Sequence, residues 1–287
     1  MKIKKNENKE KRKQTEPERG RQKMKIGFIG LGNMAKAMIG GILKQGIVTA
    51  EEIIGSAKTE ETKNRMQKEF GITIAKDNRQ AAEWAEVLVL AVKPVFFSEV
   101  IGEIEDIVGK DKLVISIAAG KTTEWIERKF RREIRLVRCM PNTPALVGAG
   151  CTAICSGSSA AKEDEELCMR LMGSFGKAIA IPERLMDAAG AVGGSSPAFV
   201  FMMIEAMADG AVQAGMPRKQ AYEFAAWSAL GSAKMVLETG LHPGELKDMV
   251  CSPGGTTIEG VKALEKRGVR AAFMEALEAC AEKSRIL

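Results

Sequence analysis

A glycine-rich turn between an apolar segment and an amphipathic segment is the strongest constraint that this sequence places on its fold. Residues 25–29 (KIGFI) have the composition of a buried strand, residues 30–35 (GLGNMA) form the turn, and residues 35–45 carry apolar side chains at helical spacing. In this strand, turn and helix context, the pattern G-x-G-x-x-A predicts a dinucleotide-binding unit. The alternative is an ordinary tight turn, which such glycines also make.

Each small residue of the turn has an expected role. Gly30 permits the tight turn, Gly32 removes a side chain that would hold a diphosphate away from the backbone, and Ala35 lets the helix pack closely on the strand. Unpaired N–H groups and the positive end of the helix dipole then attract the phosphates. The turn therefore predicts a diphosphate site.

The chain divides into two parts of different character. Up to residue 181, apolar strand-like runs alternate with helical patterns, which predicts an α/β fold with a mainly parallel sheet and ligands at the carboxyl ends of its strands. We expect the loops at 30–35, 56–58, 93–94, 118–120 and 140–144 to meet around one crevice. From residue 182 onward only helices are predicted. The expected divisions are a charged tail (1–23), a Rossmann-type dinucleotide-binding domain (24–181) and an all-α domain for substrate binding and dimerisation (182–287).

The net charge of +6 lies entirely in the tail, where residues 1–23 carry ten Lys or Arg and four Glu. The rest of the chain is neutral, so the charge gives no reason to expect nucleic acid as a partner. We interpret the tail as a disordered extension or as sequence upstream of a start at Met24. No apolar run approaches the length of a membrane span, so no membrane partner is expected.

The cysteines and the single histidine, His242, do not show the spacing of a metal site, so no metal is predicted. The six cysteines are interpreted as small buried hydrophobic residues or free thiols of a reducing, cytoplasmic compartment. His242 is interpreted as a structural residue before Pro243.

The end of the second predicted strand bears on the choice of cofactor. NAD-preferring folds place Asp or Glu there to hold the ribose 2′-hydroxyl, whereas this chain has Ser56 and Lys58. A hydroxyl and a cation favour a 2′-phosphate, and therefore NADP(H), with NAD(H) as the alternative cofactor. The two residues are equally compatible with a solvated loop.

A helix is predicted from Ser196, as its cap, through Pro197 to Gly215, and it is apolar on nearly every side near its start. A domain of about a hundred residues has little room to bury such a helix, so we expect a second subunit to cover part of it. The alternative is a helix wrapped by its own domain.

A second stretch with chemical potential lies at residues 252–257 (SPGGTT). Thr256 and Glu259 have the spacing of a capping box, which predicts a helix that starts at Thr257. Two glycines before a helix start allow successive backbone N–H groups to face one anion of carboxylate size or larger. The alternative is a capped helix after a flexible turn.

Five segments, in this order, resemble the pyrroline-5-carboxylate reductases: GFIGLGNMA, LAVKP, SIAAG, RCMPNTPA and HPGELKDMVCSPGGTTIEGV. The resemblance implies NAD(P)H-dependent reduction of 1-pyrroline-5-carboxylate to L-proline, the last step of proline synthesis. It also implies a homodimer, within larger rings such as a decamer. The substrate residues that it implies are Ser252, Gly255, Thr256 and Thr257. The cofactor residues that it implies are Ile29, Gly30, Leu31, Gly32, Asn33, Met34, Asn78, Ala91, Val92, Lys93, Pro94, Ala118, Ala119 and Gly120.

Thr257 is the candidate catalytic residue. We expect its hydroxyl to orient the ring nitrogen of the imine, because a threonine is too weak an acid to protonate it. The alternatives are another NADP-dependent imine or hydroxy-acid reductase and a non-enzymatic NADP-sensing protein. A hydroxy-acid enzyme would need a Lys or His near the nicotinamide, and residues 188–216 contain no Lys, Arg or His.

Overall fold

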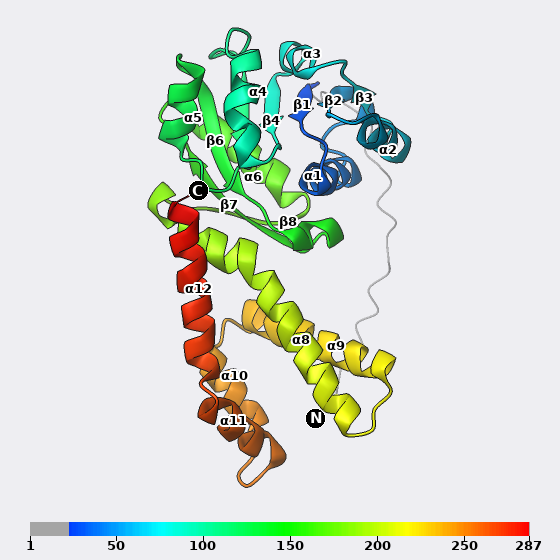
Figure 1. The fold of residues 1–287 in the computed structure, drawn as a ribbon, viewed down its shortest axis with the longest axis vertical. Helices are drawn as coiled ribbons and strands as arrows, with labels where there is room; N and C mark the ends of the chain where they lie inside the picture. Colours follow the sequence, from blue (N-terminus) through cyan, green and yellow to red (C-terminus); the bar gives the residue numbers. More distant parts are fainter. Residues whose placement is uncertain (1–22, 287) are drawn as a thin grey trace, which may run out of the picture.

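The computed structural model describes residues 23–286 of the 287-residue chain. The predicted disordered tail falls outside these residues except for Lys23. The described chain forms a sheet domain with the C-terminal helices extending from one end of it (Figure 1).

One eight-stranded sheet organises the N-terminal part, in the order β3-β2-β1-β4-β5-β6-β7-β8. All neighbouring strands are parallel except β6 and β7, which confirms the mainly parallel sheet. Strand order reverses between β1 and β4, which is where ligands bind in folds of this kind. The strands are β1 Ile26–Ile29, β2 Ile53–Ser56, β3 Thr73–Ile74, β4 Val87–Leu90, β5 Leu113–Ser116, β6 Arg135–Met140, β7 Gly150–Ser156 and β8 Gly176–Ala180.

Helices cover both faces of the sheet, which explains why its central strands are apolar at every position. α1, α2 and α6 pack on one face around Phe28 and Met38, and α3, α4 and α5 pack on the other around Leu90 and Phe97. β1, β2, β4 and β5 are fully buried. The helices are α1 Asn33–Lys44, α2 Glu60–Phe70, α3 Asn78–Trp84, α4 Phe97–Ile104, α5 Thr123–Phe130 and α6 Lys162–Gly173.

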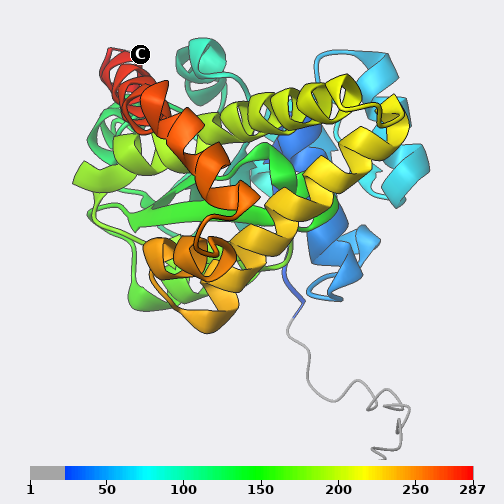
Figure 2. The same ribbon diagram turned by 90° about the horizontal axis from the view of Figure 1, so that it is seen from below.

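The C-terminal part consists of helices that spread beneath the sheet domain, with α8 and α9 diverging from a turn at Gly215 (Figure 2). α12 returns to the sheet domain, where the hydroxyl of Ser284 donates to Asp187 Oδ1 at 2.7 Å. The helices are α7 Met186–Ala189, α8 Ser196–Gln213, α9 Arg218–Thr239, α10 Pro243–Val250, α11 Thr256–Lys266 and α12 Val269–Arg285.

The prediction that Ser196 caps the start of a helix was wrong. A π-helical segment, Gly190–Ser195, joins α7 to α8, so Pro197 lies inside a continuous helix. The hydroxyl of Ser196 donates to the carbonyl oxygen of Val192, one turn earlier, instead of accepting from an N–H group. The wide π turn tolerates Pro197 because it loosens the backbone hydrogen bonds that proline disrupts.

The continuous helix Glu183–Gln213 is long and apolar enough to cross a membrane by length and composition alone. This differs from the expectation that no apolar run approaches the length of a membrane span, because the π segment joins α7 and α8 into one helix. Phe201 and Met202 of α8 are 63% and 67% exposed, and Phe224 and Trp227 of α9 are exposed as well. The chain's own helices do not wrap α8, so the alternative of burial within one chain fails.

An ion pair ties the start of the helical part to the sheet domain. Glu183 Oε1 accepts hydrogen bonds from Thr123 N at 2.7 Å and from Arg138 Nη1 at 2.9 Å, and Oε2 accepts from Thr123 Oγ1 at 2.5 Å. Burial raises the pKa of Glu183, but the hydrogen bonds from Thr123 and Arg138 outweigh it, so the net pKa lies below the ordinary 4.5. Arg138 itself is buried, so the pair is a specific anchor.

We predict that E183Q lowers the free energy of unfolding at pH 7 by about 1–2 kcal/mol, because Gln removes the charge that the buried guanidinium faces. The lowered pKa means that the carboxylate stabilises the fold above about pH 4.5, and that this contribution is lost as the pH falls through the folded-state pKa. Urea unfolding at pH 7 and pH 4, at one protein concentration, measures both effects.

The matched control is E166Q, which removes the exposed ion pair between Lys162 and Glu166 on α6. Exposed pairs of this kind contribute less than about 1 kcal/mol, so E166Q should unfold almost as the wild type does. Equal destabilisation by the two variants, or a loss for E183Q that is the same at both pH values, would contradict the anchor.

Candidate functional site

A pocket of about 550 Å³ lies where the strand order reverses. It collects residues from the ends of β1, β2 and β4 and from the start of α3, as the strand topology predicts. Its lining includes Gly30, Leu31, Gly32, Ser56, Lys58, Thr59, Asn78, Ala91, Val92, Lys93, Phe96, Glu99 and Glu103.

The two glycines of the turn are required for different reasons. Gly30 has φ of +96°, and a Cβ there would lie 2.7 Å from the carbonyl oxygen of Ala91, so the fold itself needs glycine. Gly32 has an ordinary backbone, and a Cβ there would meet nothing within 4 Å. The space beside Gly32 opens on the N-terminus of α1, which has no side-chain cap. The turn therefore fits a diphosphate held by backbone N–H groups.

The ribose end of the pocket is held by side-chain hydrogen bonds between elements. Ser56 Oγ donates to Asn78 Oδ1 at 2.6 Å, and Asn78 Nδ2 donates to Glu103 Oε2 at 2.7 Å. Lys58 is exposed, and Thr59, which caps α2, also lines this end. The Lys58 ammonium and the N-terminus of α2 thus lie at one end of the pocket, which suits an anionic group.

The predicted single crevice is only partly present. The loops after β1, β2 and β4 line the pocket. Ile29 at the end of β1, Asn33 and Met34 at the start of α1, Pro94 after β4 and residues 118–120 after β5 do not line it. The loop after β6 also does not line it, because Asn142 holds that loop against the π segment. Asn142 Oδ1 accepts from Cys151 N at 2.8 Å, and Asn142 Nδ2 donates to Gly193 O at 2.9 Å.

The loop at residues 252–257 connects α10 to α11. The predicted capping box was wrong, because Gly255 is the N-cap of α11, Thr256 is its first residue, and Glu259 instead pairs with Lys262 at 3.4 Å. Gly255 permits a close turn, since a Cβ there would lie within contact distance of Ser252 Oγ. Among the described residues, neither the Thr256 nor the Thr257 hydroxyl has a hydrogen-bond partner. The helix N-terminus and two hydroxyls are thus available to a ligand.

α10 was not predicted, and it begins at a histidine cap. His242 Nδ1 accepts a hydrogen bond from Gly244 N at 3.0 Å, which confirms that His242 is structural. A proline at the first helical position and a histidine before it are the local sequence pattern that marks this start.

One chain does not bring the two candidate regions together. The pocket lies in the sheet domain, whereas α10 and α11 lie at the opposite end of the molecule (Figure 1). Gly32 and Thr257 can share a site only if the 252–257 loop of another chain reaches the pocket.

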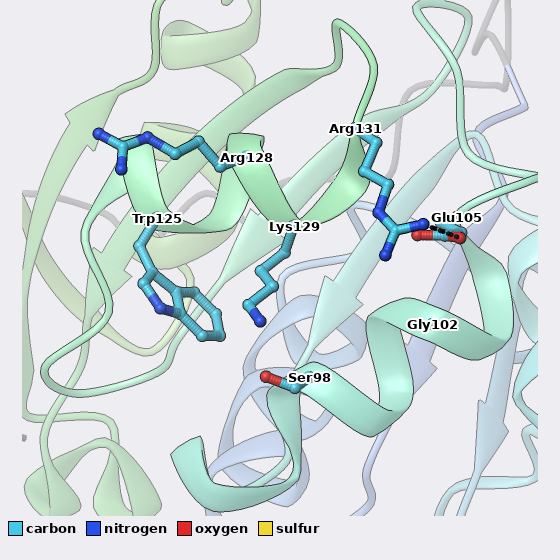
Figure 3. A pocket seen from close by; sticks show the side chains of 7 residues that line it. All are labelled: Ser98, Gly102, Glu105, Trp125, Arg128, Lys129 and Arg131. Carbon is cyan, nitrogen blue, oxygen red and sulfur yellow. Dashed lines mark ion pairs between the residues drawn. The ribbon is translucent and has the colours of Figure 1, made fainter.

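A second hollow, of about 470 Å³, lies between α4 and α5 (Figure 3). Lys129 and Trp125 point into it, with the ammonium 5.3 Å from the ring centroid, and Arg131 lies 3.8 Å from Glu105. Among the described residues that line it, none comes from the glycine turn or from the 252–257 loop. The cations that line this hollow, Arg128, Lys129 and Arg131, already have partners within the protein.

The buried thiols offer no reactive group either. All six cysteines are free, as predicted, and Cys139 and Cys168 are fully buried with their sulfur atoms 3.3 Å apart. Burial raises the pKa of Cys155 to about 12 and that of Cys139 well above its ordinary value, so both stay protonated. Within residues 23–286, no group of three or more His, Cys, Asp or Glu side chains is placed to hold a metal ion.

We predict that G32A folds with an unchanged melting temperature but binds NADPH about tenfold or more weakly, because the new Cβ occupies the open space at the N-terminus of α1. Fluorescence titration and thermal unfolding measure the two properties. G30A is the comparison, and it should lower the melting temperature because of its positive φ and its clash with Ala91. Unchanged NADPH binding by G32A would exclude the turn as the diphosphate site.

Comparison with protein families agrees with this two-part architecture. Residues 183–287 match the family model "Pyrroline-5-carboxylate reductase dimerisation", and residues 25–120 match "NADP oxidoreductase coenzyme F420-dependent". The first match covers the helices with exposed apolar side chains, and the second covers the glycine turn and the pocket.

Curated relatives and solved structures extend the match to nearly the whole chain. The pyrroline-5-carboxylate reductase of Escherichia coli (strain K12) is 48% identical, over 91% of this chain and 97% of that protein, and that of Methanosarcina acetivorans is 46% identical, over 93% and 98%. The structure of the Coxiella burnetii enzyme superposes with a TM-score of 0.86 at 34% identity, covering 92% of this chain and 98% of that one. The Plasmodium falciparum enzyme, solved with NADP bound, gives 0.83 at 32% identity, with 92% and 97% covered. This chain therefore belongs to the pyrroline-5-carboxylate reductase family.

Proposed function

We propose that this protein is an NAD(P)H-dependent pyrroline-5-carboxylate reductase, which reduces the imine 1-pyrroline-5-carboxylate to L-proline in the last step of proline biosynthesis. The observation that carries the proposal is the pairing, within a chain of this family, of a backbone cradle for a diphosphate with an uncapped helix N-terminus for a small acid. The Plasmodium falciparum relative was solved with NADP bound, which supports NADP(H) as the cofactor here.

The pocket residues divide into two binding roles. The N–H groups that follow Gly32 hold the diphosphate. Lys58 and the N-terminus of α2 at Thr59 receive the 2′-phosphate of NADPH, and Ser56 lines the same end through its hydrogen bond to Asn78. NADPH, when bound, supplies the hydride that the imine carbon accepts. Residues 91–94 and 118–120 follow the neighbouring strands β4 and β5, so we propose that they line the path toward the nicotinamide end.

The 252–257 loop binds the substrate. Its N–H groups at the start of α11 hold the carboxylate, with Ser252, Gly255 and Thr256 shaping the turn, and the Thr257 hydroxyl hydrogen-bonds the ring nitrogen. Thr257 orients the imine and does not protonate it, because an alcohol is too weak an acid near neutral pH. The proton arrives with the substrate or from water, and positioning of the imine supplies most of the rate.

Two other functions fit the chain less well. A hydroxy-acid reductase moves a proton on or off an alcohol oxygen, and residues 188–216, which include the π segment and α8, contain no Lys, Arg or His for that task. A non-enzymatic NADP sensor would need the pocket but not the 252–257 loop. Neither alternative accounts for both regions.

A second copy of the chain completes the site. The exposed apolar side chains of α8 and α9 form the surface on which it docks, and they lie within residues that match a dimerisation family. Docking of this surface brings the 252–257 loop of one chain to the pocket of another. We propose a cytoplasmic homodimer, which assembles further into rings such as a decamer.

We predict that the purified protein oxidises NADPH when 1-pyrroline-5-carboxylate is added, with L-proline as the product. The decrease in NADPH absorbance gives the rate, and amino-acid analysis identifies proline. A 2-keto acid added in place of the imine should give no comparable rate, because the chain offers no proton donor for an alkoxide. Consumption of NADPH with the keto acid but not with the imine would favour the hydroxy-acid alternative.

We also predict that two defective variants restore each other's activity when mixed. T257A should lower kcat/KM by about tenfold to a hundredfold through loss of one transition-state hydrogen bond, and G32A lacks an effective cofactor cradle. When subunits exchange freely, about half of the dimers contain one chain of each variant. In each such dimer, one of the two sites combines an intact Gly32 turn with an intact Thr257 loop, so about a quarter of the wild-type activity should return.

T257S is the matched control, since it keeps the hydroxyl and should retain most of the activity by itself. If the mixture of T257A and G32A is only as active as the average of the two variants, then each site is built from a single chain and the shared site is wrong.

A further inference from the structure

An exposed aromatic side chain lies in the NADP(H) pocket outside the family motifs. Phe96 ends the short 3₁₀ turn Pro94–Phe96 after β4, lines the pocket and is 41% exposed. The ammonium of Lys58 lies over its ring, 5.6 Å from the centroid. Lys58 lines the same pocket, so its contact with the ring lies within the pocket.

We propose that Phe96 is the stacking platform for the adenine ring and that Lys58 rests on this platform until a 2′-phosphate draws it away. The proposal deepens the cofactor site described above and rests on it. It adds a specificity-determining residue, Phe96, and a competition between Lys58 and the base for one ring face.

The position of Phe96 suits a nucleotide base. Phe96 lies beside Lys58 in the same pocket, at the end that also holds Ser56 and Asn78, so a base that follows a ribose bound at that end would reach the ring. An exposed aromatic ring at that place offers stacking, which binds bases without regard to sequence and is a strong contact for each base.

The charges around Lys58 define where a phosphate can go. Glu99 and Glu103 line the α4 side of the pocket and would repel a phosphate, and Glu103 is occupied by Asn78. Lys58 and the N-terminus of α2, capped by Thr59, lie on the other side. A 2′-phosphate therefore belongs on the α2 side, and Lys58 must leave the ring to reach it.

This competition favours NADPH over NADH in a way that a simple salt bridge would not. Either cofactor displaces Lys58 from Phe96 when its base stacks there. The 2′-phosphate of NADPH gives the ammonium a new partner, whereas NADH gives it none, so NADH binding loses the cation–π contact without replacement. Part of the preference for NADPH therefore comes from weaker binding of NADH.

A double-mutant cycle on nucleotide binding tests the proposal. The probes are adenosine 2′,5′-bisphosphate and 5′-AMP, measured by calorimetric titration at physiological salt in the wild type, K58A, F96L and the double variant. The matched control is V95A, because Val95 precedes Phe96, is 77% exposed and does not line the pocket.

F96L should weaken both nucleotides by about fivefold or more, through loss of stacking. K58A should weaken only the bisphosphate, by about tenfold. For AMP, K58A should change the affinity differently in the two backgrounds. The ratio of the AMP affinity with K58A to that without it should be about two- to fivefold higher when Phe96 is present than in F96L, because Lys58 obstructs the base only when the ring is there. V95A should bind both nucleotides as the wild type does.

If K58A changes the affinity for AMP equally in the two backgrounds, then Lys58 and the base do not compete. If F96L binds both nucleotides with wild-type affinity, then Phe96 does not stack on the base. Either result overturns the proposal. Because neither nucleotide carries a nicotinamide, the expected pattern persists even if the chain fails to reduce 1-pyrroline-5-carboxylate, so the two proposals fail separately.

Discussion

The close attachment of the glycine turn to the two strands beside β1 is the constraint on which the cofactor pocket depends. Gly30 N donates to the carbonyl oxygen of Ser56 at 3.0 Å, and Ala91 N donates to the carbonyl oxygen of Ile29 at 2.8 Å. These bonds extend the sheet by one residue where the strand order reverses, and they require a positive φ at Gly30. The N-terminus of α1 is thereby fixed relative to β2 and β4, so the position proposed for the diphosphate is set by backbone geometry.

The two parts of the chain satisfy their apolar surfaces in different ways. The sheet is closed on both faces by helices of the same chain, so its core is complete within one subunit. The C-terminal helices have only a small core of their own, around Ala208, Ala221 and Ala225, and they leave large apolar side chains exposed. Small residues at that contact let α8 and α9 approach closely, but they bury little area. The helical part therefore leaves an apolar surface that is suited to self-association, whereas the sheet completes its core within one chain.

The sequence was sufficient to predict features that depend on local chemistry. The strand before the glycine turn, the turn itself and the mainly parallel sheet follow from the periodicity of apolar residues and from local backbone requirements. The helix starts at Ser196 and Thr257 were wrong for a related reason. Each has a correct local pattern, but Gly255 is the N-cap of α11, and the π segment Gly190–Ser195 precedes Ser196 without a break in the helix. Contacts such as Glu183 with Thr123 span 60 residues, and no local pattern predicts them.

A reaction that relies on positioning is well matched to a site shared between subunits. Neither the pocket nor the 252–257 loop holds a histidine or a thiol, and the described thiols with raised pKa are buried elsewhere. What the proposed chemistry requires is a fixed separation between hydride donor and imine, which is highly sensitive to small displacements. In the proposed shared site, that separation is set by the docking of two parts, the cradle at Gly32 and the loop at Thr257. The Glu183 anchor fixes the start of the helical part on the sheet domain, so it would contribute to this positioning without touching the reactants.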